Sequence, residues 1–271
     1  MLKKNRFIAI VILLFSFIPV SFAKDKTESD KLLDIGISFA IPPWVIAENN
    51  TGIELDILKE AFKLSGYRIK PNYLSFALSY SLFEAGKLDG ILNVTTASVK
   101  RGFFSEPVVT FQNVAISLKE KNFPAEIDLE YLSEKSVVAF QKASILLGEE
   151  FGQAMSGNLR YQEVAKQNLQ INLLMIRDID FIIMEKNIFG YYWQQAQSDP
   201  HLIRAKSKLN RPVQIHYLFN PTEYRFVFAT EKIRDAFNNG LKTIKENGIY
   251  DEIFGRYSHL IDLHSKQHPL N

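Results

Sequence analysis

Short apolar segments alternate with amphipathic helical segments, and this alternation constrains the fold more than any other feature of the chain. Apolar residues at helical spacing, such as Ile53, Ile57 and Ala61, predict helices, and apolar runs between turn residues predict buried strands. The first series is strand 32–38, helix 52–66, strand 67–74 (bent or on an edge at Pro71), helix 75–87 and strand 88–94. Buried strands that alternate with helices indicate a parallel α/β sheet.

The alternation begins again in the second half, which predicts a second α/β unit of similar size. Its expected elements are strand 136–140, helix 145–155, strand 159–164, helix 166–178, strand 179–185 and helix 187–197. The connecting segment 108–119 is expected to be extended, and 213–219 and 224–230 are strand-like. Two helices, 231–248 and 249–258, are predicted to end the fold.

The first 23 residues have the pattern of a cleaved secretory signal. Lys3, Lys4 and Arg6 precede an apolar run over 7–18, and Ser21-Phe22-Ala23 offers small residues for cleavage after Ala23. Pro19 and the short run argue against a membrane anchor. A lipoprotein is excluded because the chain has no cysteine. Export without disulfides predicts a periplasmic location.

Length and charge narrow the class of protein further. Removing 23 of 271 residues leaves 271 − 23 = 248, which allows two domains, and 46% hydrophobic residues can form their cores. Loss of the three leader cations takes the net charge from +2 to −1. Such a balance gives no reason to expect a nucleic-acid partner.

Six stretches, in this order, resemble the bacterial periplasmic solute-binding proteins of the polar amino-acid type, solute-binding protein family 3. The resemblance covers about residues 34–258. The stretches are "PPWVIAENNTGIELDILKEAFKLSG", "LFEAGKLDGILN", "FFSEPVV", "VVAFQKAS", "IRDIDFIIME" and "IKENGIYDEIFGRY".

The resemblance implies the two-lobe type 2 periplasmic-binding-protein fold. Each lobe would be a mostly parallel sheet flanked by helices, and two crossover strands would act as hinges. Lobe 1 is expected at 24–110 and 221–271 and lobe 2 at 111–220, with hinges near 110–112 and 223–226. The ligand would lie between the lobes, at the carboxyl ends of parallel strands.

By resemblance, the ligand's α-carboxylate would be held by "TASVKR" (96–101). Thr96, Ser98 and Arg101 match the family's two hydroxyl residues and arginine, and Arg101 follows Asp89 by the family's twelve residues. A guanidinium pairs with a carboxylate through two parallel hydrogen bonds. Only Gly102 and Phe103 separate Arg101 from "FSEP", where the family has about five residues. Aligned from that side, Ser98 takes the arginine position and the ligand need not be a standard amino acid.

The resemblance places further ligand contacts in the second unit. Ser144 matches a residue that donates to the carboxylate from a helix start, although an ordinary N-cap serine is the alternative. Lys142 stands where the family often has glycine. Glu185 matches the acid that pairs with the ligand's ammonium, and its alternative role is to cap the segment that follows. Asp180 is expected to order the entry to its strand.

Two aromatic residues match positions that enclose the ligand's side chain in the family. Trp44 follows a double proline, and Phe76 begins the second helix. Flat aromatic faces bury methylene groups and attract cations.

The predicted function is capture of a small polar solute, an amino acid or a close analogue, for delivery to an ABC importer. The chain is expected to be a monomer with no cofactor. No metal is expected either, because the pair His264 and His268 is followed by a proline in a polar tail. No nucleophile or phosphate-binding motif indicates an enzyme. A stand-alone sensor or orphan binder, and a dehydratase or lyase on the same scaffold, are the alternatives.

Overall fold

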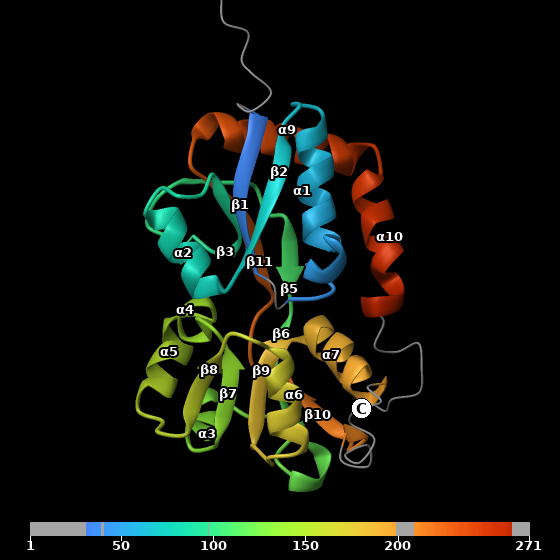
Figure 1. Cartoon of the computed structure of the whole chain (residues 1–271). Coiled ribbons are helices and arrows are strands. Elements are labelled where there is room, and N and C mark those ends of the chain that lie inside the picture. The colour runs from blue at the N-terminus through green and yellow to red at the C-terminus, as the bar shows by residue number, and fades with distance from the viewer. Residues whose placement is uncertain (1–30, 39–40, 97, 199–208, 262–271) are drawn as a thin grey trace, which may run out of the picture. The chain divides into compact units, whose positions relative to one another are not determined.

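The computed structural model describes residues 31–38, 41–96, 98–198 and 209–261, and these residues contain two β-sheets with their helices (Figure 1). The predicted α/β class is thereby confirmed. The predicted signal sequence and His264 and His268 lie outside the described residues. Within the described part of the chain, no helix is long and apolar enough to cross a membrane.

The first sheet has the strand order β2-β1-β3-β11-β4, and β5 also pairs with β11. Its edge strand β2 contains Pro71, as predicted, because an edge strand tolerates the missing N–H. Its strands are β1 (Leu32–Ser38), β2 (Arg68–Leu74), β3 (Gly90–Val94), β4 (Phe103–Phe104), β5 (Val109–Phe111) and β11 (Thr222–Phe228). The helical elements of this part are η2 (Ala47–Asn49), α1 (Ile53–Lys63), α2 (Phe76–Glu84), α9 (Glu231–Glu246) and α10 (Ile249–Ile261).

The second sheet has the strand order β10-β6-β9-β7-β8. Its strands are β6 (Asn113–Leu118), β7 (Val137–Phe140), β8 (Tyr161–Val164), β9 (Phe181–Glu185) and β10 (Val213–His216). The helical elements here are η3 (Lys119–Lys121), α3 (Leu129–Ser133), α4 (Ala143–Leu146), α5 (Glu149–Ser156), α6 (Asn168–Met175) and α7 (Lys186–Ser198). The lobe boundaries expected from the sequence stay a prediction.

Both sheets are mixed, with more antiparallel pairing than the predicted mostly parallel sheets. Strand β1 pairs in parallel with β2 and β3, and β7 pairs in parallel with β8 and β9. The strands that connect the two sheets are antiparallel to their neighbours: β11 against β3, β4 and β5, and β6 against β9 and β10. Helical crossovers produce parallel neighbours, whereas a strand returning from the other sheet enters in the opposite direction.

The single helix predicted over 145–155 is wrong, because the segment forms two helices. Helix α4 ends at Leu146 and α5 begins at Glu149. Gly148 between them has φ +99°, a left-handed conformation that ends a helix and that glycine adopts without strain.

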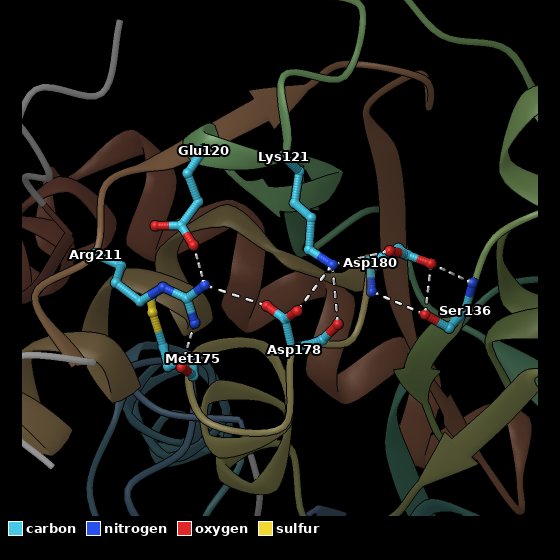
Figure 2. A network of polar contacts seen from close by, with 7 residues as sticks. All are labelled: Glu120, Lys121, Ser136, Met175, Asp178, Asp180 and Arg211. Carbon is cyan, nitrogen blue, oxygen red and sulfur yellow. Dashed lines mark hydrogen bonds and ion pairs between the residues drawn. The ribbon is translucent and has the colours of Figure 1, made fainter.

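A polar network holds the amino-terminal ends of β7 and β9, the ends away from Phe140 and Glu185 (Figure 2). Asp180 accepts hydrogen bonds from Ser136 N at 3.0 Å and Ser136 Oγ at 2.7 Å, and pairs with Lys121 at 3.3 Å. Burial acts to raise the pKa of Asp180, but these partners together lower it. Asp180 thus orders its strand entry, as predicted.

Helices α1 and α9 pack with their backbones in direct contact. A Cβ added at Gly240 would stand 1.8 Å from the carbonyl oxygen of Ala61, so the two backbones meet directly. Gly255 on α10 is also helical, but a Cβ there would meet nothing within 4 Å. Close packing therefore requires glycine at position 240 but not at position 255.

We predict that Gly240→Ala lowers the free energy of unfolding by about 1–3 kcal/mol, because α9 must move away from α1. The matched variant Gly255→Ala should raise it by about 0.5–1 kcal/mol, the usual gain when alanine replaces a helical glycine. Urea unfolding measures both. Equal effects of the two variants would contradict the close α1–α9 contact.

Candidate functional site

A pocket lies where residues of both sheets meet, with about 280 Å³ of space that includes its opening to solvent. Three of its residues, Asn93, Phe140 and Glu185, lie at the carboxyl ends of β3, β7 and β9. Open α/β sheets bind ligands at this end of their strands. The pocket is lined by Ile41, Phe76, Asn93, Phe111, Asn113, Phe140, Leu146, Gln167, Glu185, Ile188 and Tyr224.

Glu185 is a buried carboxylate at the edge of this pocket. Its Oε2 accepts hydrogen bonds from Trp44 Nε1 at 3.0 Å, Asn187 N at 2.8 Å and Ile188 N at 3.0 Å. Its Oε1 accepts from Asn187 Nδ2 at 3.1 Å. Glu185 therefore caps the first turn of α7 while it lines the pocket. Burial raises its pKa to about 7, although these donors act to lower it.

Glu54, which the sequence analysis did not select, is a second buried carboxyl group. It lies in the first turn of α1, fully buried, and its Oε2 accepts from Asn93 Nδ2 at 2.7 Å. Burial raises the pKa of Glu54 to about 8, and the Asn93 bond acts against this rise while the charge of Glu185 adds to it. The sequence held one signal: Glu54 shares its helix face with Leu58 and Ala61.

Three buried amide side chains line the pocket with polar atoms that lack a hydrogen-bond partner within the described residues. These atoms are Asn93 Oδ1, Asn113 Nδ2 and Gln167 Oε1. Each side chain is at most 3% exposed. A buried polar atom without a partner costs about 1–3 kcal/mol, so three of them at one cavity mark a place where bound water or a polar ligand would supply the missing partners. Asn93 and Asn113 could have been noticed as amides inside apolar strands.

Aromatic rings form much of the apolar wall, and Phe76 is among them. Phe76 begins α2 and is 8% exposed. Phe111 and Tyr224 pack against each other with ring centroids 4.7 Å apart. Flat apolar walls of this kind suit methylene groups and attract cations.

Trp44 does not line the pocket but lies behind it. Its ring stacks on Phe111 at 4.6 Å, and its indole N–H donates to Glu185. Gly52 makes this placement possible, because a Cβ there would stand 2.5 Å from the Trp44 carbonyl oxygen. Trp44 therefore fixes Glu185 and Phe111 rather than forming the pocket wall.

Thr96, Ser98 and Arg101 do not line the pocket. Arg101 is exposed; it donates from Nη1 to the Glu84 carbonyl at 3.0 Å and lies over the Phe83 ring at 5.7 Å. Ser98 Oγ bonds to the backbone of Thr95, and Thr96 is exposed. The Arg101 contacts lie at the carboxyl end of α2. Because β4 begins at Phe103, two residues after Arg101, the short connection keeps this arginine beside α2.

Ser144 also has a partner within the chain. Its backbone N–H donates to Glu163 Oε1 at 2.9 Å, and that of Lys142 donates to Glu163 Oε2 at 2.6 Å. Tyr161 Oη donates to Glu163 Oε1 at 2.8 Å. The sequence analysis did not select Glu163, because an acidic residue in an edge strand such as β8 is expected to face solvent.

Comparison with known proteins places the chain in a family. The family model of the bacterial extracellular solute-binding proteins, family 3, matches residues 33–259, and the chain belongs to this family. A search of curated proteins found no match.

Solved structures show the same fold at low identity. An ancestral arginine-binding protein bound to arginine has a TM-score of 0.68 and 18% identity, over 84% of this chain and 98% of the other. The amino acid ABC transporter substrate-binding protein AbpA from Streptococcus pneumoniae, bound to L-arginine, has a TM-score of 0.65 and 18% identity, over 87% and 98%. A histidine kinase sensor domain with similarity to periplasmic binding proteins has a TM-score of 0.68 and 13% identity, over 84% and 97%.

The two raised pKa values predict how stability depends on pH. The folded protein holds protons on Glu54 and Glu185 that the unfolded chain releases near pH 4.5, so their contribution is full at acidic pH and is lost as pH rises toward about 8. Each group contributes at most about 1.4 kcal/mol per pH unit. Burial lowers the pKa of His216, so this residue makes the stability rise with pH at the acidic end of the range.

We therefore compare the ligand-free protein with the double variant Glu54→Gln/Glu185→Gln by urea unfolding from pH 5 to pH 8. The wild type should lose stability relative to the variant as pH rises, and the comparison cancels His216. Glu252→Gln, at an exposed position of α10, should behave as the wild type. Parallel pH profiles for the wild type and the double variant would contradict the raised pKa values.

Proposed function

We propose that the protein binds a small polar solute, an amino acid or a close analogue, in this pocket and delivers it to an ABC importer. The observation that carries the proposal is the group of buried, unpartnered polar atoms on a cavity lined by both sheets. Membership of the family and the amino-acid ligands named for similar structures support the solute class. Within this proposal the protein acts in the periplasm, as a monomer, without turnover.

Contacts between elements of the two sheets support a mechanism in which two lobes separate to admit the ligand. Trp44 Nε1 bonds to Glu185, Ala77 N donates to Gln141 Oε1 at 3.1 Å, and the Lys142 ammonium lies 4.8 Å from the Tyr80 ring centroid. These contacts and the packing of α10 against α7 break on opening, while the connections β5–β6 and β10–β11 act as hinges. A ligand that binds the closed form better shifts the population toward it.

A thermal-shift screen of the mature protein against amino acids, amines and organic acids tests the proposed function. A ligand present at a hundred times its Kd should add about 2.7 kcal/mol of stability. Mass analysis after incubation should recover the ligand unchanged. Absence of stabilisation by every class would contradict solute binding, and conversion of the ligand would favour the enzyme alternative.

The variant Gln167→Met tests two separate effects of the unpartnered Gln167 Oε1: its effect on the stability of the ligand-free protein and its effect on ligand affinity. Methionine has a similar volume and no acceptor, so we predict that the ligand-free variant gains about 1 kcal/mol of stability. Affinity for the ligand found in the screen should fall at least about tenfold, equivalent to about 1.4 kcal/mol.

Urea unfolding and calorimetry measure the two effects, with Gln153→Met at an exposed position of α5 as the matched control. Unchanged ligand affinity in Gln167→Met would show that Gln167 makes no contact with the ligand.

A further inference from the structure

The groups expected to hold a ligand carboxylate are engaged elsewhere in the chain. The Arg101 guanidinium donates to the Glu84 carbonyl and lies on the Phe83 ring. The backbone N–H groups of Lys142 and Ser144 donate to the two oxygens of Glu163. These N–H groups are therefore already bonded to a carboxylate of the protein itself.

The described residues that line the pocket include no lysine, arginine or histidine. Lys142 stands in the adjacent loop, but its ammonium lies over the Tyr80 ring, and Lys142 does not line the pocket. Burial of a carboxylate without a cation or several donors is costly. The pocket thus offers a carboxylate little compensation for its lost hydration.

The pocket does offer acceptors. Asn93 Oδ1 and Gln167 Oε1 are buried without partners, while Asn93 Nδ2 donates to Glu54. The Glu185 carboxyl group also lines the pocket, and Phe76 and Phe111 add aromatic faces. A positive ligand beside Glu185 favours the ionised form of this carboxyl group, so the acceptors, the ionisable acid and the aromatic walls together match the N–H donors and positive charge of an amine.

We propose that the site selects a small amine or guanidine that carries no carboxylate. This inference rests on the proposed binding function and narrows its solute class. The amine would donate to Asn93 Oδ1, Gln167 Oε1 and Glu185, while its carbon skeleton packs on the aromatic rings. Asn113 Nδ2 remains as a donor for a hydroxyl or carbonyl oxygen of the same ligand.

Matched pairs that differ only by the carboxylate test the proposal on the unmodified protein. The pairs are agmatine with arginine, cadaverine with lysine, 3-methylbutylamine with leucine and phenethylamine with phenylalanine. Calorimetry should show at least one amine binding ten times or more tighter than its amino acid. If amino acids bind as tightly as their amines or tighter, the inference is overturned while the binding function stands. If only an organic acid binds, the inference also fails. If no small solute binds, both the inference and the proposed function fail.

A second test, Glu163→Ala, is expected to strengthen the binding of amino acids. This change frees the two N–H groups beside Phe140, so the affinity for the amino-acid member of a pair should rise by fivefold or more. Glu149→Ala, at an exposed acid of α5, is the control and should leave the ratio of the two affinities unchanged. Amino-acid affinity that stays as in the wild type, in a Glu163→Ala protein with a normal melting transition, would contradict the blocking role of Glu163.

Discussion

The buried hydrogen bond from the Trp44 indole to Glu185 is the interaction on which the geometry of the pocket depends. It joins the loop after β1 of one sheet to the last residue of β9 of the other. The same carboxylate fixes the start of α7 through Asn187 and Ile188, and the same indole fixes the ring of Phe111. Because both partners are buried, loss of the Glu185 carboxyl group leaves the indole N–H of Trp44 without a partner, whereas loss of Trp44 removes one of the four hydrogen bonds to Glu185.

Polar atoms without partners make this pocket a costly part of the fold. The two carboxyl groups of Glu54 and Glu185 are fully enclosed, and amide atoms of Asn93 and Gln167 face the cavity unpaired. A chain selected for stability alone would place apolar side chains here, since isosteric apolar replacements cost little. We infer that the ligand supplies the missing partners. Binding then removes the cost of the unpartnered atoms, and this gain contributes to affinity and specificity.

Most of the fold could be predicted from the sequence, because alternating apolar strands and amphipathic helices report burial directly. The errors arose where one residue decides the backbone, as at Gly148, or where strand direction depends on the path between sheets, as at β6 and β11. The site was harder, because a pattern names residue types but not their neighbours. Glu185 and Phe76 lie at the pocket, whereas Arg101 bonds to Glu84 and the Ser144 N–H bonds to Glu163, both through contacts that no local pattern indicates.

A crystal structure of the protein with the tightest solute from the screen tests the central claim most directly, that the unpartnered polar atoms between the two sheets form the ligand site. The account predicts the solute within hydrogen-bond distance of Asn93 Oδ1, Gln167 Oε1 or the Glu185 carboxylate, with its carbon skeleton against Phe76 and Phe111. A solute held instead by Arg101 and Thr96, with these buried atoms still unpaired, would contradict it.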